Sequence, residues 1–215
     1  MLALITGSGL LPATLSAQLE TPPLVCALEG FDPVGLAVDL SFRLETLGTL
    51  LADLQARGVS EICMAGTISR PSIDPGRIDA ATMPLVPVMQ QALMAGDDGA
   101  LRAVLSIFEQ AGFLIRGAHE LAPDLLPGLG SLTELTPTAA DQRDADRGTG
   151  IIRAMCAADV GQACVVLRGQ ALAIEGVFGT NWMLQSLTQR PDAGGGVLVK
   201  APKPQQELRV DMPAI

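Results

Sequence analysis

The sequence predicts an α/β protein with two domains, and two observations carry that prediction. Short apolar segments alternate with segments of helical periodicity up to residue 117, a pattern typical of a parallel sheet covered by helices. A stretch rich in proline, glycine and threonine then interrupts the alternation before a second, shorter set of helices and strands. We therefore expect a Rossmann-like N-terminal domain over residues 1–130, a linker over 131–138, and a smaller C-terminal α/β domain over 139–215.

The N-terminal domain is expected to begin with a strand, a glycine turn and a helix. The apolar segment 2–5 leads into Gly7-Ser8-Gly9, and leucines then recur at helical spacing behind Pro12. Because glycines let a ligand approach the backbone and a helix N-terminus offers free N–H groups, Gly7 and Gly9 are candidates to line a phosphate. Pro12 occupies the third glycine position of the dinucleotide fingerprint, which disfavours binding of nicotinamide or flavin cofactors.

The rest of this domain follows from the same two patterns. The loop after the expected third strand carries Ser69 and Arg70, and loops at that position in open parallel sheets bind ligands. His119 beside Glu120 fits a general base, whereas a hydrogen-bonded structural histidine is the commoner role at a strand end. We expect strands at residues 24–28, 59–65 and 113–117, and helices at residues 83–94, 97–110 and from 47 to about 57.

The C-terminal domain is predicted to combine helices with a small sheet. Thr180 or Asn181 is expected to be the N-cap of its second helix, because hydroxyl and amide oxygens accept hydrogen bonds from the free N–H groups of a first turn. The expected elements are a helix at 139–157, a hairpin of strands 163–167 and 171–175 turning at 168–170, a helix at 182–188 and a strand at 197–199.

The C-terminal residues have the highest density of chemically useful side chains. Lys200, Lys203 and Arg209 are interspersed with prolines that favour a stiff, extended backbone, and rigidly held cations suit phosphate. Alternation over residues 208–212 predicts a short strand that carries Arg209 and Asp211 on one face. A solvated connector with a surface ion pair is the alternative interpretation of the same residues.

Charge and hydropathy exclude several classes of protein. The net charge is −9 and the isoelectric point is about 4.5, which argues against a general nucleic-acid or anionic-membrane surface and makes any phosphate site local. Hydrophobic residues make up 48% of the chain, yet no apolar run approaches the roughly 20 residues needed to span a bilayer. The first residues lack the basic region of a signal peptide, so we expect a soluble cytoplasmic protein. Because the net charge is negative, we also expect that it binds no nucleic acid.

Histidine and cysteine usage narrows the chemistry further. His119 is the only histidine, which excludes a multi-histidine zinc site and a Ser-His-Asp triad without that residue. Cys26, Cys63, Cys156 and Cys164 lack a Cys-x-x-Cys pair and are expected to be buried, reduced thiols. A metal would have to bind carboxylates, which favour Mg²⁺ or Mn²⁺ over zinc.

Residues 200–215 closely resemble the terminal signature of the LpxI-type UDP-2,3-diacylglucosamine pyrophosphatases. That signature reads approximately Lys-x-x-Lys-Pro-x-Gln-(Asp/Glu)-x-Arg-x-Asp-x-Pro-x-Ile, and this chain follows it from Lys200 to Ile215. The similarity covers nearly the whole chain. Its other parts are Gly7-Ser8-Gly9 with Pro12, Ala65-Gly66, Ser69-Arg70-Pro71, Gly96-Asp97-Asp98, residues 112–120, Asp159-Val160-Gly161-Gln162, Glu175 and Gly179-Thr180.

The resemblance implies a two-domain enzyme of Gram-negative lipid A synthesis that cleaves UDP-2,3-diacylglucosamine to UMP and 2,3-diacylglucosamine 1-phosphate (lipid X). Water would attack the α-phosphorus with help from Mg²⁺ or Mn²⁺, and Asp211 would bind the metal or orient the water. The resemblance also implies a homodimer in the cytoplasm with peripheral contact to the inner membrane. The residues expected to bind the substrate or its phosphates are Lys200, Lys203, Arg209, Gly7, Gly9, Ser69, Arg70, Thr180 and Asn181.

Two departures from the family pattern leave alternatives open. Where the family has Glu-Gly-Thr-Asp, this chain has Phe178-Gly179-Thr180-Asn181, and family members continue beyond the point where this chain ends. The chain is thus expected to be a C-terminally shortened member. A catalytically impaired paralogue that binds a nucleotide-sugar, a lipid or a protein without turnover is the second hypothesis, and a nicotinamide-dependent oxidoreductase is the third.

Overall fold

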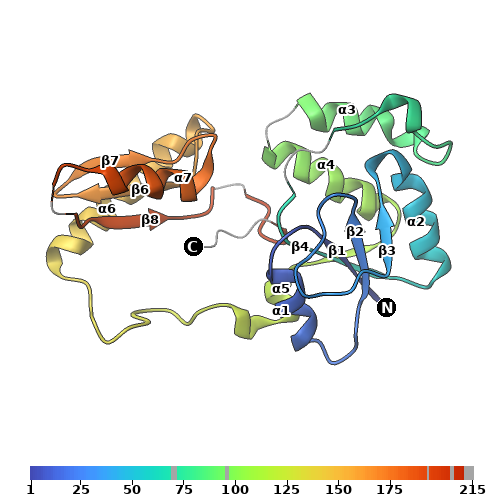
Figure 1. Cartoon of the computed structure of the whole chain (residues 1–215), viewed down its shortest axis with the longest axis horizontal. Helices are drawn as coiled ribbons and strands as arrows, with labels where there is room; N and C mark the ends of the chain where they lie inside the picture. Colours follow the sequence, from blue (N-terminus) through green and yellow to red (C-terminus); the bar gives the residue numbers. More distant parts are fainter. Residues whose placement is uncertain (69–71, 95–96, 193, 204–205, 211–215) are drawn as a thin grey trace. The chain divides into compact units, whose positions relative to one another are not determined.

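The structure is a computed structural model that describes residues 1–68, 72–94, 97–192, 194–203 and 206–210 (Figure 1). The described residues divide into two compact units. The first unit comprises residues 1–126 together with 207–210, and the second lies within residues 127–206. Ser69, Arg70 and Asp211, three of the predicted site residues, lie outside the described residues.

The first unit is built on a parallel sheet, as predicted. Its described strands are ordered β3-β2-β1-β4-β5, and every neighbouring pair is parallel. The order reverses between β1 and β4, and the loops at the carboxyl ends of such strands form the usual ligand crevice of open α/β sheets. The sequence patterns missed β3. The strands are β1 Leu2–Thr6, β2 Leu24–Leu28, β3 Leu40–Phe42, β4 Glu61–Ala65 and β5 Leu114–Arg116.

Helices cover both faces of this sheet (Figure 1). Successive residues of a strand point to opposite faces, so Ala3 and Ile5 join the cluster that includes residues of α2 and α4, while Leu4 packs with Leu15 of α1. The fully apolar segments of the sequence are therefore strands buried on both sides. The helices are α1 Leu11–Gln18, α2 Leu47–Ala56, α3 Val86–Met94, α4 Asp97–Gln110 and α5 Ala118–Leu121. Short 3₁₀ turns lie at Leu44–Thr46, Pro75–Arg77, Met83–Leu85 and Pro123–Leu125.

The second unit packs helices against a small antiparallel sheet. The described strands are ordered β7-β6-β8, and the β6–β7 hairpin turns at Arg168 and Gly169, which both have positive φ. The buried Asp144 carboxylate accepts hydrogen bonds from both of their backbone N–H groups at 2.8 and 2.7 Å, tying α6 to the turn. The elements are α6 Ala139–Ala157, β6 Ala163–Leu167, β7 Gln170–Ile174, α7 Gly179–Ser186, a 3₁₀ turn Leu187–Gln189 and β8 Val197–Lys200.

The N-cap predicted for α7 is wrong. The helix begins at Gly179 behind Phe178, which makes no side-chain cap hydrogen bond, so Thr180 and Asn181 lie inside its first turn. The Thr180 hydroxyl is instead engaged by Glu175 and Lys200. Hydrogen bonds to residues outside the helix have taken the place of the local cap.

The strand predicted at residues 208–212 is also wrong over its described part. Residues 208–210 form a turn in which the Val210 N–H donates to the Glu207 carbonyl at 3.2 Å. Neither described sheet includes this segment, and an unpaired strand would leave its backbone groups without partners. Val210 packs against the core of the first unit, whereas Leu208 is exposed.

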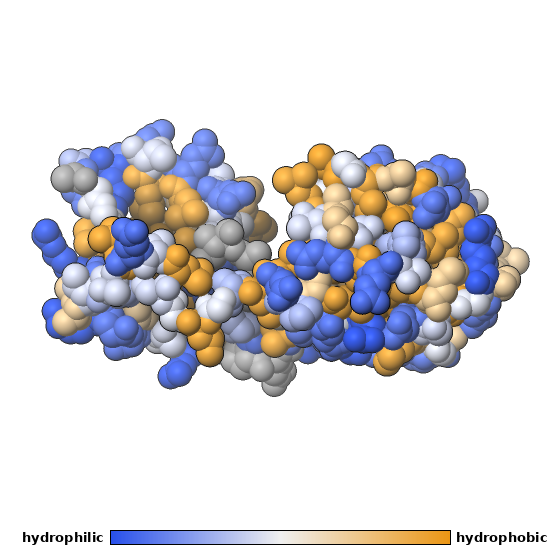
Figure 2. Space-filling model, turned by 90° about the horizontal axis from the view of Figure 1, so that it is seen from below, coloured by the Kyte–Doolittle hydropathy of each residue, from blue (hydrophilic) through white to orange (hydrophobic). Residues whose placement is uncertain are grey.

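Apolar side chains also reach the surface of both units among polar ones (Figure 2). None of the helices in the described ranges combines the length and the hydropathy required to cross a membrane. Large exposed hydrophobic residues of the second unit include Ile174, Val177, Phe178 and Trp182.

Candidate functional site

The glycine turn after β1 lies at the carboxyl edge of the parallel sheet and is joined there to two other loops. The Ser8 N–H donates to Thr67 O, and the Thr67 N–H donates to Ser8 O, both at 2.9 Å. A Cβ on Gly7 would lie 2.5 Å from Thr67 O, so only glycine lets these loops pack together. Gly7 thus has a structural explanation, and its backbone N–H is already used by Ala65 O.

Gly9 connects the same turn to the segment after β2. Its carbonyl accepts a hydrogen bond from the Val34 N–H at 3.0 Å, and it forms an isolated bridge with Pro33. Gly9 has φ of +106°, and a Cβ there would meet no atom within 4 Å. Its glycine is therefore required by backbone conformation, and open space beside it is compatible with a ligand.

Residues 207–210 bring Arg209 to the first unit. Its guanidinium donates to both carboxylate oxygens of Glu207, at 2.9 and 2.8 Å, and to Glu109 at 2.8 Å. These carboxylates raise the pKa of Arg209. A Cβ on Gly117 would lie 3.4 Å from the Arg209 Cα, so the turn packs closely behind β5. In this arrangement Arg209 holds the segment in place, and its donors are used by carboxylates rather than left for phosphate.

Lys200 belongs to a hydrogen-bonded chain in the second unit. Its Nζ donates to Thr180 Oγ1 at 2.9 Å, and the Thr180 hydroxyl donates to Glu175. Glu175 is 8% exposed and also accepts from the Gln162 backbone N–H at 2.7 Å. Lys200 forms no ion pair with any described residue. The Thr180 hydroxyl, itself held by Glu175, therefore orients the Lys200 ammonium. Because this direct partner is uncharged, the charge of Lys200 remains available to an anion.

The other predicted residues of this unit are placed differently. Lys203 forms an ion pair with Asp159 at 2.5 Å, and Asn181 is exposed in the first turn of α7. The structure thus brings Lys200 and Thr180 into direct contact. Glu175 was missing from the predicted set. Its sequence signal is an acid beside a glycine at the end of an otherwise apolar segment.

The residues around His119 serve the fold of the first unit. Arg116 donates to Glu61 and Glu120, each at 2.9 Å, and the bond from Arg116 is the main reason that the pKa of Glu120 is lowered. His119 packs against Gly117, where a Cβ would lie 2.5 Å from its Cε1. Glu120 is therefore already engaged, which favours the structural interpretation of this pair.

No group of three or more histidine, cysteine or acidic side chains within the described ranges could hold a metal ion. Asp211, the residue predicted to bind Mg²⁺ or Mn²⁺, lies outside the described residues, so its role as a ligand stays a prediction. The cysteines are free thiols, and Cys26, Cys63 and Cys164 are buried as predicted, whereas Cys156 is only half-buried. Burial raises the pKa of Cys26 and of Cys63 to about 12, so neither thiol is reactive at neutral pH.

Comparison with known proteins identifies the family. Residues 1–125 match the LpxI N-terminal domain, and residues 128–215 match the LpxI C-terminal domain. The chain belongs to the LpxI family. A relative from Caulobacter vibrioides, named UDP-2,3-diacylglucosamine pyrophosphatase LpxI, is 35% identical over 226 aligned residues, which cover 100% of this chain and 81% of the relative. The family resemblance and the α/β fold with a second small domain are both confirmed.

Proposed function

We propose that this protein hydrolyses the pyrophosphate bond of UDP-2,3-diacylglucosamine to UMP and 2,3-diacylglucosamine 1-phosphate. The observation that carries the proposal is the 35% identity, over the full chain, with the Caulobacter relative of that name. In this reaction, water oxygen bonds to the α-phosphorus, the bridging P–O bond breaks, and the lipid-sugar phosphate leaves. The water oxygen stays in UMP and the bridging oxygen leaves with the lipid-sugar phosphate. The two protons of the water are released as these phosphates ionise.

Lys200 is the described residue best suited to the developing phosphate charge. It has no carboxylate partner among the described residues, and the Thr180–Glu175 chain holds its amine. A cation that is oriented before the reaction stabilises charge on phosphoryl oxygens without having to reorganise. Lys203 would contribute only if a ligand displaced Asp159. Gly9, Ser69 and Arg70 remain proposed contacts to the nucleotide or its phosphates, and Asn181 a proposed contact to the substrate.

We retain Asp211 as the proposed ligand for Mg²⁺ or Mn²⁺, or as the residue that orients water. The metal, when bound, would neutralise phosphoryl charge.

The deciding experiment measures UMP release from the purified full chain with and without Mg²⁺, beside Asp211→Ala and a version lengthened to the family pattern. We expect metal-dependent release that Asp211→Ala abolishes. Release only from the lengthened version would assign the missing activity to the chain's extent. Absence of release from every folded version would overturn the enzymatic proposal.

A catalytically impaired member that binds without turnover is the second candidate. It is favoured by Phe178 and Asn181, which stand where the family pattern has acids, and by the ion pairing of Lys203 and Arg209. Phe178→Glu combined with Asn181→Asp restores the family residues. A gain of UMP release in that variant would support the impaired state, while UMP release by wild type that the variant does not exceed would contradict it.

Peripheral contact with the inner membrane and a homodimeric state are further proposals. The surface formed by Ile174, Val177, Phe178 and Trp182 supports the first, because Phe178 and Trp182 are exposed and their ring centroids lie 5.3 Å apart. From Gly169 to Gln189 the sole charged residue is Glu175, which is buried. Exposed aromatic residues without nearby charge suit a lipid interface.

We expect Phe178→Ser with Trp182→Ser to reduce cosedimentation with phospholipid vesicles, while Leu132→Ser, a change of another exposed apolar residue, leaves it unaltered. Equal cosedimentation of all three proteins would contradict contact through this surface. Light scattering at several concentrations tests the dimer.

A further inference from the structure

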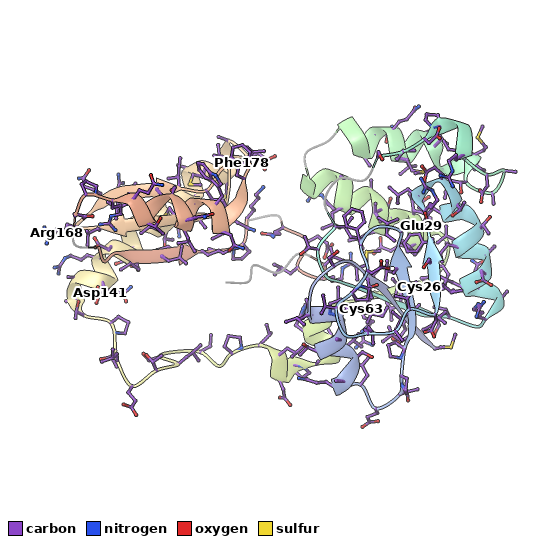
Figure 3. The ribbon with its side chains drawn as sticks, in the orientation of Figure 1. Cys26, Glu29, Cys63, Asp141, Arg168 and Phe178 are labelled. Carbon is purple, nitrogen blue, oxygen red and sulfur yellow. The ribbon has the colours of Figure 1, made fainter. Side chains whose placement is uncertain are left out.

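A cavity of about 310 Å³ lies at the carboxyl end of β2 and β3 in the first unit. Its volume is near the lower end of the range for small-ligand pockets. Figure 3 shows Glu29 near the arrowhead end of β2. The lining residues are Leu28, Glu29, Gly30, Phe31, Arg43, Leu44, Glu45 and Ser72.

One arginine organises the polar wall of this cavity. Arg43 donates to Glu29 at 2.8 Å and to Glu45 at 3.2 Å. Glu45 is 2% exposed and also accepts from the Asp74 N–H at 2.8 Å, so it anchors the arginine to the fold. The Glu29 side chain is 50% exposed, and it therefore keeps acceptor capacity for a ligand.

The same arginine has an unsatisfied group. Its Nε is buried and has no hydrogen-bond partner among the described residues. A buried donor without a partner is costly, and such groups often await a ligand or a water molecule. Because this atom is buried, the polar group that the cavity itself offers to a ligand is the exposed Glu29 carboxylate.

The charge of the cavity selects the kind of ligand. Two carboxylates against one guanidinium leave a net negative wall, which repels a phosphate but accepts hydrogen bonds from hydroxyl groups. The segment that follows Phe31 of the cavity wall contacts the glycine turn, because the Val34 N–H donates to the Gly9 carbonyl. The cavity and the glycine turn therefore lie on the same edge of the sheet. Glu29 also follows Gly9 by 20 residues, and an acid at about that separation binds a ribose hydroxyl in dinucleotide-binding sheets.

We infer that this cavity binds the nucleoside of the substrate, with the Glu29 carboxylate accepting hydrogen bonds from the ribose hydroxyls. The inference rests on the proposed function for the identity of the nucleotide as a uridine nucleotide. With the nucleoside in this cavity, the phosphates would bind at the neighbouring glycine turn. Glu29 is thus a binding residue that the sequence patterns did not single out.

The test is calorimetric binding of UMP and 2′-deoxyUMP, which is independent of turnover. Relative to wild type, we expect Glu29→Ala to lower the affinity for UMP about tenfold, the usual effect of losing a charge-assisted hydrogen bond. The preference for UMP over 2′-deoxyUMP should shrink in the same variant. Mere loosening of Arg43 would weaken both nucleotides equally and preserve the preference, which would overturn the ribose contact.

Two further variants complete the experiment. Glu20→Ala removes an exposed carboxylate away from the cavity and should leave both affinities unchanged. Ser72→Leu narrows the cavity without removing the Arg43 hydrogen bonds and should weaken both nucleotides. Unaltered UMP affinity in Glu29→Ala and Ser72→Leu would overturn the inference, as would a wild-type protein that binds no UMP. A protein that binds UMP in this manner but releases none would overturn the proposed function alone.

Discussion

Lys200 and Arg209 show how differently two neighbouring cations of one motif are used. Sequence spacing treats both as phosphate ligands, since each is a cation in a proline-rich segment. The structure gives Arg209 three hydrogen bonds to carboxylates and gives Lys200 a single bond to a hydroxyl. A guanidinium engaged by two carboxylates acts mainly as an anchor, while the ammonium of Lys200 keeps its charge for a ligand.

We therefore expect Lys200→Ala to lower kcat/KM for UMP release by about 100-fold, the usual scale for losing one oriented electrostatic contact. Arg153→Ala, which removes an exposed cation of α6, is the matched control and should leave kcat/KM unchanged. Steady-state measurement of UMP release decides the matter. Equal losses in the two variants would point to a general effect of charge rather than to a phosphate contact.

Among the elements, the glycine turn after β1 is where local and tertiary requirements meet. The strand, turn and helix were predictable because their signals are local. The reason that position 7 must be glycine was not predictable, because it depends on Thr67, which is far away in the sequence. Gly66 faces the same constraint, since its Cβ would lie 2.6 Å from Gly7 O.

Gly7→Ala should destabilise the first unit by about 1–3 kcal/mol or more, because its Cβ would meet a backbone oxygen that cannot rotate away. Denaturant unfolding followed by circular dichroism measures this change. An unfolding free energy equal to that of wild type would show that the two loops separate at little cost.

Helix α6 provides the opposite case. Gly150 lies inside this helix, and a Cβ there would meet no atom within 4 Å. Gly150→Ala should therefore stabilise the second unit by about 0.5–1 kcal/mol, since glycine loses more conformational freedom than alanine in a helix. The fluorescence of Trp182, the single tryptophan, reports on this unit. A lower midpoint of unfolding would contradict the expectation.

At the scale of the whole molecule, the described C-terminal residues 207–210 return to the unit formed by the first half of the chain. Arg209 and Glu109 are 100 residues apart in sequence, so no local pattern predicts their contact. The contact links the chain's family signature to α4. It makes the position of this segment sensitive to the protonation of its carboxylates.

The sign of that sensitivity follows from Glu207. The hydrogen bond from Arg209 holds the pKa of Glu207 below its ordinary value of 4.5 in the folded state. The interaction thus contributes its full stability above that ordinary pKa, and the contribution is lost as pH falls through the lower folded-state pKa. We expect the thermal stability advantage of wild type over Glu207→Gln to be constant from neutral pH down to about 4.5 and to shrink as the pH falls further.

Differential scanning calorimetry over this pH range provides the measurement. Glu134→Gln is the control, because Glu134 is an exposed residue of the segment before α6. Its stability difference from wild type should not change with pH. A pH-independent difference between wild type and Glu207→Gln would show that the ion pair is not formed in solution.

The elements whose causes are local, and the family, could be predicted from the amino-acid sequence alone. The signals for the apolar strands, the periodic helices and the C-terminal motif each lie within one short continuous segment. Residue patterns and the family resemblance were therefore enough to predict them. The folded structure was needed to show which charged groups are already paired and that Phe178 rather than Thr180 precedes α7. It was also needed to show that Glu29, Arg43 and Glu45 line one cavity. Those outcomes depend on contacts between side chains that are distant in sequence. Charge pairing and burial arise from such contacts and not from any single segment.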